Sequence, residues 1–414
     1  MKNGMATPTL NGAGREPKSK CGRLTGVACA GSLLLLSAHL VSAATLNKDQ
    51  AKRMYDRIAG VTASDATLTS MVGMDATQAA LNIVTKDPAF YNNTIRNLAM
   101  PWTNRDQTVF APLNDYVATV VGMVRDDVPF NTLLSADLVY IADASATSTY
   151  SLPAYSPANN DLYQQMDDSG VDLKAHLVSS TQSALTGLPA AATAGVLTTR
   201  AAAAAFFING TNRAMFRFTM MNHLCSDLQT IMDTTRPPDR IRQDVTRSPG
   251  GDSGLFLNNC IGCHSGMDPM AQAFAYYNFN NTDATTADTM GQIVYTAGQV
   301  QPKYFINNTN FPQGFITPND HWDNRWRAGV NSLLGWDPNL TGTGTGAKSL
   351  GQELAGSQAF AGCQVTRVFK YVCFRAPSDA ADRTQVATMV ASFKSSNYSL
   401  RQVFADAAVY CMGN

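Results

Sequence analysis

The sequence predicts a mainly α-helical fold made of two helical domains, because apolar residues recur at helical spacing along most of its length. They repeat every three or four positions in residues 46–59, in residues 79–84 after a potential capping Asp75, and most clearly in residues 113–124. Apolar residues make up 45% of the 414 positions and charged residues only 15%. The chain can therefore bury a sizeable core and is too apolar to be disordered.

Residues 1–43 have the layout of a secretory signal peptide. Five basic residues lie in the first 23 positions, an apolar run with four consecutive leucines follows at 24–40, and Val41-Ser42-Ala43 supplies a cleavage site of small residues. The apolar run is shorter than the ~20 residues that a membrane-spanning helix needs, so we expect cleavage rather than an anchor. The mature protein is then expected in the periplasm or on the cell surface, without a membrane span.

The net charge excludes one class of partner. The chain has 31 basic and 31 acidic residues, and cleavage after residue 43 would remove five of the basic residues and one of the acidic ones. A nearly neutral protein lacks the strongly basic surface that nucleic-acid binding requires. No nucleic-acid partner is therefore expected.

The mature chain is expected to divide at about residue 190. Residues 44–190 are predicted to form a helical N-terminal domain, interrupted by a long loop at 142–170, where Ser, Asn, Asp, Pro and Tyr dominate. Residues 191–414 are predicted to form a second helical domain with a loop-rich insertion at about 280–350. Within this insertion, the Thr-Gly run at 341–346 has the composition of a flexible surface segment.

Several helices are expected in the second domain. An alanine run at 201–205 favours a helix that begins near Thr199, and helical spacing continues through 211–232. Three further helices are predicted near the C-terminus, at 354–374, 379–393 and 399–410.

The five residues from Cys260 to His264 form the motif C-x-x-C-H, which is the attachment signature of c-type haem. Two thiols on one helical turn can each add to a vinyl group of the same porphyrin, and the adjacent His264 then faces the iron as the proximal ligand. We therefore predict one covalent haem c, held by Cys260, Cys263 and His264. The ring N–H of His264 needs an acceptor, for which the carbonyl of Pro269 or a nearby residue is a candidate.

Other uses of this motif agree less well with the sequence. A structural zinc site needs four ligands, and no second C-x-x-C or H-x-H pair completes such a set. A redox dithiol is possible, but thioredoxin-like motifs follow a strand in an α/β pattern, whereas this neighbourhood is predicted to be helical. Haem attachment is therefore the favoured interpretation.

Four further cysteines remain in the mature chain, and an even number in an exported protein predicts two disulfides. Cys363 and Cys373 fall on one predicted helix, about 15 Å apart at 1.5 Å per residue, which is too far to bridge. Of the two remaining pairings we favour Cys225–Cys363 with Cys373–Cys411. The alternative is that these thiols are free and buried.

The sixth ligand of the iron decides the function, and several candidates remain open. His321 is ranked first, followed by Met290 and His223, and the position could also be open or bound by water. Met267 ranks low because it is three residues from His264 and on the same side of the haem. Four arginines are candidates for bidentate contacts with the haem propionates: Arg213, Arg217, Arg325 and Arg327.

A family resemblance supports the haem. Gly195–Thr198, the Pro237-Pro238 turn and Cys260–Pro269, together with Phe369–Tyr371 and Tyr398–Arg401, resemble the cytochrome-like domains of unknown function first noted in large planctomycete proteins. The resemblance covers roughly residues 188–279 and 357–410. It implies a mostly helical, exported haem-c module without a settled activity. The expected fold is thus a helical N-terminal domain plus a helical, c-type cytochrome-like C-terminal domain with long loops.

We therefore expect a mono-haem c-type cytochrome that passes one electron to a redox partner protein in the cell envelope. One alternative is a haem-c peroxidase or oxygenase with an open distal site, although no second C-x-x-C-H motif is present to deliver electrons. Another is a non-catalytic envelope binding protein in which the haem is structural. The large helical N-terminal half, which an electron carrier does not need, keeps this second alternative open.

Overall fold

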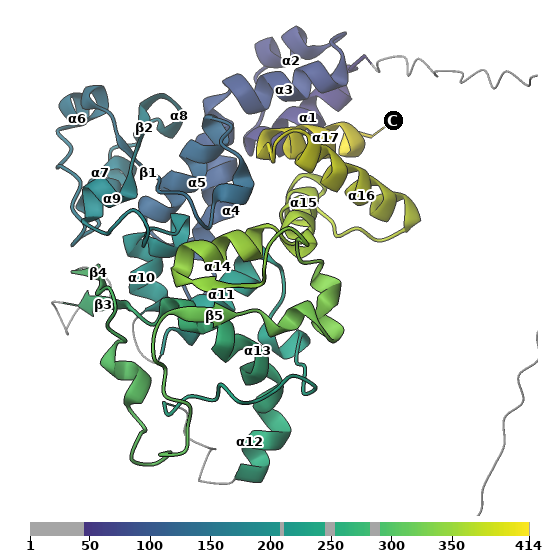
Figure 1. Ribbon diagram of the computed structural model, residues 1–414. Coiled ribbons are helices and arrows are strands. Elements are labelled where there is room, and N and C mark those ends of the chain that lie inside the picture. The colour runs from purple at the N-terminus through teal and green to yellow at the C-terminus, as the bar shows by residue number, and fades with distance from the viewer. Residues whose placement is uncertain (1–44, 208–210, 245–252, 282–289, 414) are drawn as a thin grey trace, which may run out of the picture. The chain divides into compact units, whose positions relative to one another are not determined.

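A computed structural model describes residues 45–207, 211–244, 253–281 and 290–413, and Figure 1 shows how its elements are arranged. The signal peptide expected at residues 1–43 lies outside the described residues. Where the structure describes the chain, it is mainly α-helical, as predicted, with three small two-stranded antiparallel sheets. None of the described helices is long and apolar enough to cross a membrane.

The N-terminal helices begin where the sequence predicts. Asn47 caps the first helix by accepting a hydrogen bond from the Gln50 amide at 2.9 Å, and Asp75 caps the third by accepting from the Gln78 amide at 2.8 Å. The apolar residues of the predicted stripe at 113–124 are all buried. The helices of this part are α1 (Lys48–Ala59), α2 (Asp65–Met71), α3 (Ala76–Lys86), α4 (Arg96–Ala99) and α5 (Asp115–Arg125).

The prediction of a long loop at 142–170 is wrong, because two helices lie within it. Asp143 caps the first by accepting a backbone hydrogen bond at 2.6 Å, and Leu162, Tyr163 and Met166 bury one face of the second. The Ser, Asn and Asp residues that suggested a loop are also the types that cap helices. Their abundance therefore drew attention away from the helical spacing of Leu162, Tyr163 and Met166. The elements here are β1 (Val139–Ala142), α6 (Ala144–Tyr150), α7 (Asp161–Asp168), α8 (Leu173–His176), β2 (Leu177–Ser180) and α9 (Gln182–Thr186).

The second half combines predicted helices with strands that the sequence analysis missed. Thr199 caps a helix, as expected, but the helix predicted over 211–232 ends at His223. The run 341–346, expected to be a flexible surface segment, contains a strand paired with residues 321–323. The elements are α10 (Arg200–Phe206), α11 (Arg213–His223), α12 (Ser253–Asn259), α13 (Ile261–Ala271), β3 (Tyr277–Asn281), β4 (Gly291–Tyr295), β5 (His321–Asp323) and β6 (Thr343–Thr345).

The three predicted C-terminal helices are present, although residues 354–355 end a separate helix before them. These elements are α14 (Gly346–Ala355), α15 (Gln358–Cys373), α16 (Ala380–Ser395) and α17 (Leu400–Cys411). Helix α17 packs against α1 and α3 as well as against α15 and α16, and Figure 1 shows it in yellow beside the purple N-terminal helices. The two ends of the described chain thus share one core and belong to one compact unit. The expected division into two domains at residue 190 is not confirmed.

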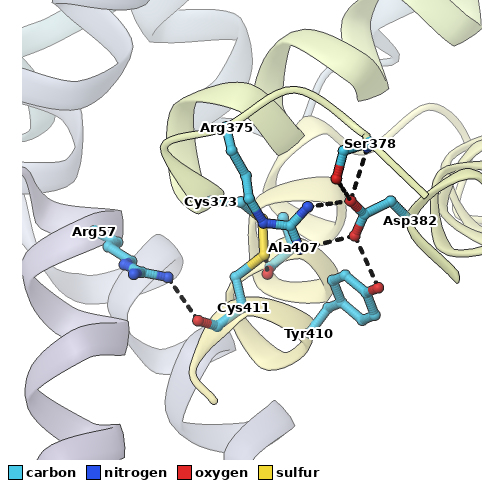
Figure 2. Close-up of a disulfide and its surroundings, with 8 residues drawn as sticks. All are labelled: Arg57, Cys373, Arg375, Ser378, Asp382, Ala407, Tyr410 and Cys411. Atoms are coloured by element: carbon cyan, nitrogen blue, oxygen red, sulfur yellow. Dashed lines mark hydrogen bonds and ion pairs between the residues drawn. A yellow bond between two sulfur atoms is a disulfide. The ribbon is translucent and has the colours of Figure 1, made fainter.

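Both predicted disulfides are present. Cys225 pairs with Cys363, with Cα atoms 5.3 Å apart, and joins the end of α11 to α15. Cys373 pairs with Cys411, with Cα atoms 5.4 Å apart, and joins α15 to α17 (Figure 2). Beside this second disulfide, Arg57 of α1 donates a hydrogen bond to the Cys411 carbonyl at 2.6 Å. Covalent and hydrogen bonds therefore connect α1, α15 and α17 at one place.

Candidate functional site

The motif Cys260–His264 lies at the beginning of α13. Cys260 is the residue before the helix, and its carbonyl accepts hydrogen bonds from the amides of Cys263 at 3.2 Å and His264 at 3.1 Å. The two thiols and the imidazole therefore come from one helical turn, as the sequence predicts. All three residues are partly exposed, so the turn is accessible for covalent attachment.

Close packing fixes the orientation of α13. The amide of Asp233 donates to the Gly262 carbonyl at 2.9 Å, and the hydroxyl of Ser265 donates to the Asp233 carbonyl at 2.8 Å. Gly266 lets the indole of Trp326 lie directly on the helix, because a Cβ atom at this position would be 2.0 Å from the ring. These contacts position the turn that bears the motif.

The two motif cysteines are free, whereas the other four described cysteines all form disulfides. Burial raises the pKa of Cys263, the neighbouring Asp227 and Cys260 add to this effect, and Arg217 opposes it. A free pair of thiols on one helical turn is what both covalent haem attachment and a redox dithiol require.

The imidazole of His264 is bonded to a carboxylate on its own helix. Nδ1 of His264 lies 3.0 Å from Oδ2 of Asp268, four residues further along α13. The expectation that a backbone carbonyl, such as that of Pro269, accepts this hydrogen bond is therefore wrong. One helical turn separates His264 from Asp268, which brings the carboxylate directly beside the ring.

Asp268 belongs to a buried ion-pair network. Arg213 of α11 forms two hydrogen bonds with Asp268, at 2.7 and 3.0 Å, and two with Asp244, at 2.7 and 3.1 Å. The side chains of both aspartates are fully buried. Arg242, also buried, lies 3.4 Å from Asp244 and 4.3 Å from the centroid of the Tyr304 ring. Two guanidinium groups thus balance two carboxylates beneath the motif.

This network keeps Asp268 ionised. Burial alone would raise the pKa of Asp268, but the charge of Arg213, together with the hydrogen bond to His264, outweighs burial and holds this pKa far below its ordinary value. An ionised carboxylate only accepts hydrogen bonds, so the proton in the contact belongs to Nδ1 of His264. In the neutral ring, Nε2 then has the lone pair with which an imidazole binds a metal.

The donor set of the motif fits a covalently attached haem. Cys260 and Cys263 supply thiols on one turn, and His264 supplies an imidazole whose other nitrogen is bonded to a carboxylate, which is usual for metal-binding histidines. In the part of the chain that the structure describes, no three His, Cys, Asp or Glu side chains form a group that could hold a metal ion by themselves. A haem brings four nitrogen ligands of its own, so the protein needs to supply only the axial ones.

His321, the first-ranked candidate for the sixth ligand, lies on β5, which packs against α13. Its side chain is partly exposed, with Nε2 at 3.3 Å from the Thr343 hydroxyl and 3.4 Å from the Asp323 carboxylate. A hydrogen bond joins the loop before β5 to the residue that follows α13: the side-chain amide of Gln272 donates to the Asn319 carbonyl at 3.1 Å. His321 is therefore on an element that neighbours the motif helix.

The other methionine and histidine candidates have different neighbours. Nε2 of the buried His223 lies 2.7 Å from the Tyr116 hydroxyl, and burial, with the charge of Arg367, holds the pKa of His223 well below its ordinary value. Met290 is exposed and directly precedes β4, which packs against α10. Met267 is buried in the core. The structure thus gives His223 the surroundings of a neutral core histidine.

The four arginines predicted to contact haem propionates are all paired with carboxylates of the chain. Any role with propionates would require these ion pairs to break, so the structure does not support this prediction. The pairs are Arg213 with Asp244 and Asp268, Arg217 with Asp227, Arg325 with Asp239, and Arg327 with Glu353.

Asp268, the residue that orients His264, was not predicted from the sequence. A signal was available, because a residue four positions after a helical histidine lies on the same face. The pairing of Arg213 with Asp244 had no such local signal, since it depends on how α11 packs against α13.

Comparison with known proteins assigns no family to this chain. It matches no protein-family model, no curated protein and no solved structure. The interpretation of the site therefore depends on the chemistry of its residues and on the contacts between them.

Proposed function

We propose that this protein is a mono-haem c-type cytochrome that transfers single electrons in the cell envelope. In this proposal Cys260 and Cys263 hold the porphyrin through thioether bonds and His264 is an axial ligand. The haem, when bound, supplies the iron that changes oxidation state.

The observation that supports the proposal most strongly is the state of the motif residues. Two thiols on one turn are free in a chain whose other described cysteines are paired, and they adjoin an imidazole oriented by Asp268. A thiol pair, a neighbouring histidine and a carboxylate that fixes its tautomer together meet the chemical needs of covalent haem attachment.

Export is part of the proposal. The two disulfides support it, because disulfides persist in the periplasm and at the cell surface but are rare in the reducing cytoplasm. Residues 1–43 then serve as the signal peptide. The partner is a redox protein that approaches the partly exposed turn bearing Cys260, Cys263 and His264.

We propose His321 as the sixth ligand, because it lies on the strand that packs against α13. A haem-c peroxidase or oxygenase with an open sixth position is the second candidate function. The ionised Asp268 favours this candidate, since a carboxylate bonded to Nδ1 makes His264 a more basic ligand, and basic ligands stabilise the higher oxidation states of a metal.

Haem attachment is tested by the mass of the purified mature protein and by its absorption spectrum in alkaline pyridine. We expect a mass increase equal to one haem and a c-type spectrum in the wild type, with neither in Cys260→Ala/Cys263→Ala. The matched control is Cys373→Ala/Cys411→Ala, which also removes two cysteines, from a disulfide between α15 and α17, and should keep the haem. A wild-type protein with the mass of the bare polypeptide would refute the proposal.

Carbon monoxide then separates the two candidate functions. An electron carrier with two protein ligands shows a reduced spectrum that carbon monoxide does not change. An enzyme with an open position shows a shifted spectrum and also consumes hydrogen peroxide in the presence of an electron donor. The second result would identify the protein as a haem enzyme instead of an electron carrier, and haem attachment itself would still hold.

A further inference from the structure

We infer that Asp268 is a positioning residue that lowers the reduction potential of the bound haem through its hydrogen bond to His264. This inference rests on the proposed haem attachment. It starts from the contact of 3.0 Å between Oδ2 of Asp268 and Nδ1 of His264, which leaves Nε2 as the metal-binding nitrogen.

Two features make Asp268 a strong acceptor. Its side chain is fully buried, so water does not compete for the hydrogen bond. It is also held in place by Arg213, which bonds both of its oxygens and is itself fixed by two bonds to Asp244. A hydrogen bond to an ionised acceptor is roughly twice as strong as one between neutral groups.

The expected effect on the iron follows from charge. An ionised acceptor at Nδ1 increases the electron density of the imidazole and so stabilises ferric iron more than ferrous iron. Reduction adds one electron, which a nearby negative charge disfavours. Asp268 therefore biases the bound haem toward the oxidised form, more than the neutral backbone carbonyl expected from the sequence would do.

The chain offers a matched pair of variants to test this. Asp268→Asn keeps the shape of the side chain and removes its charge. Asp244→Asn removes the same charge from an equally buried aspartate bonded to the same Arg213, but Asp244 is not the partner of His264. The measurement is the reduction potential, obtained by titrating the absorption spectrum against applied potential.

We expect Asp268→Asn to increase the equilibrium constant for reduction at least tenfold, which corresponds to a rise of about 59 mV for a one-electron couple. Asp244→Asn should produce a clearly smaller change. Equal shifts in the two variants, or no shift in Asp268→Asn, would overturn the inference and leave haem attachment intact. A wild type without haem would instead remove the proposed function, and the inference with it.

A second variant covers the case in which Asp268→Asn does not fold because Arg213 is left with excess charge. Combining Asp268→Asn with Arg213→Gln removes one charge of each sign, and Arg242 remains to balance Asp244 at 3.4 Å. We expect this double variant still to raise the reduction potential, because the hydrogen bond to an ionised acceptor is lost, but by less than Asp268→Asn alone, because the loss of the Arg213 charge disfavours reduction. A potential equal to that of the wild type would overturn the inference.

Discussion

Cys225 and Cys363 lie 138 residues apart in the sequence, yet their disulfide joins the end of α11 to α15. Helix α11 begins at Arg213, the residue whose guanidinium bonds Asp268 below the motif. One end of α11 is thus fixed by a covalent bond and the other by buried ion pairs. The disulfide thereby helps to hold Arg213 against α13.

Removal of this disulfide should destabilise the fold. We expect Cys225→Ala/Cys363→Ala to lower the free energy of unfolding by about 2–5 kcal/mol, mainly because the unfolded chain gains freedom. Urea denaturation followed by circular dichroism measures the change. The matched variant Cys373→Ala/Cys411→Ala opens a shorter loop of 38 residues, so its free energy of unfolding should fall by less. Equal unfolding midpoints for the wild type and the first variant would contradict this expectation.

Gly266 should not tolerate a larger side chain. A Cβ atom there would lie 2.0 Å from the Trp326 indole, so Gly266→Ala must displace the ring or the helix, at a cost of about 1–3 kcal/mol in unfolding free energy. Gly362→Ala is the control, because it also lies within a helix but has no atom within 4 Å of the added Cβ. Alanine favours helices over glycine by up to about 1 kcal/mol, so this control should keep or gain stability. Thermal unfolding of the two variants compares them directly.

Asp382 should make stability depend on pH. Hydrogen bonds from Arg375 and Ser378 hold the pKa of Asp382 well below its ordinary value, and Tyr410 donates to the same carboxylate at 2.9 Å (Figure 2). A carboxyl with a lowered pKa in the folded state stabilises the fold above its unfolded pKa, near 4, and this contribution is lost as the pH falls further.

The variant Asp382→Asn tests this dependence. At pH 7 it should unfold at a lower urea concentration than the wild type, and the difference should narrow as the pH falls below about 4. Asp406→Asn, on the neighbouring α17, is the control, because the Asp406 carboxylate accepts a hydrogen bond from the neutral side chain of Gln402 at 2.7 Å. A difference between wild type and Asp382→Asn that is the same at every pH would argue against the ionised contact.

His321→Ala tests the proposed sixth ligand. If β5 supplies this ligand, its removal opens the position, so the reduced variant should bind carbon monoxide and shift its main absorption band. The wild type should show no such shift. His176→Ala is the control, because this partly exposed histidine contacts Asp143 at 3.3 Å on another part of the chain. A variant that responds to carbon monoxide like the wild type would exclude His321.

Features that depend on neighbouring residues could be predicted from the sequence. Asp75 and Thr199 cap the helices expected after them, because capping involves residues only three positions apart. The thiols and imidazole of the motif share one turn for the same reason. Local geometry also excluded a disulfide between Cys363 and Cys373, which lie on one helix, but it did not decide between the two remaining pairings.

Features that depend on distant segments could not be predicted. The packing of α17 on α1 and α3 involves residues more than 300 positions apart, and no local pattern indicates it. The partner of His264 is a similar case, since Asp268 is a strong acceptor only because Arg213 approaches from another helix. The helices within 142–170 were missed because their polar residues resemble those of a loop.

The position of α17 has a consequence for the order of events during synthesis. Helices α1 and α3 are made early and pack against each other, but the helix that covers both of them exists only when residues 400–411 have been made. The packing of the first helices is therefore completed only by the last helix to be made, and a chain truncated before residue 400 would leave the α17-facing surfaces of α1 and α3 uncovered.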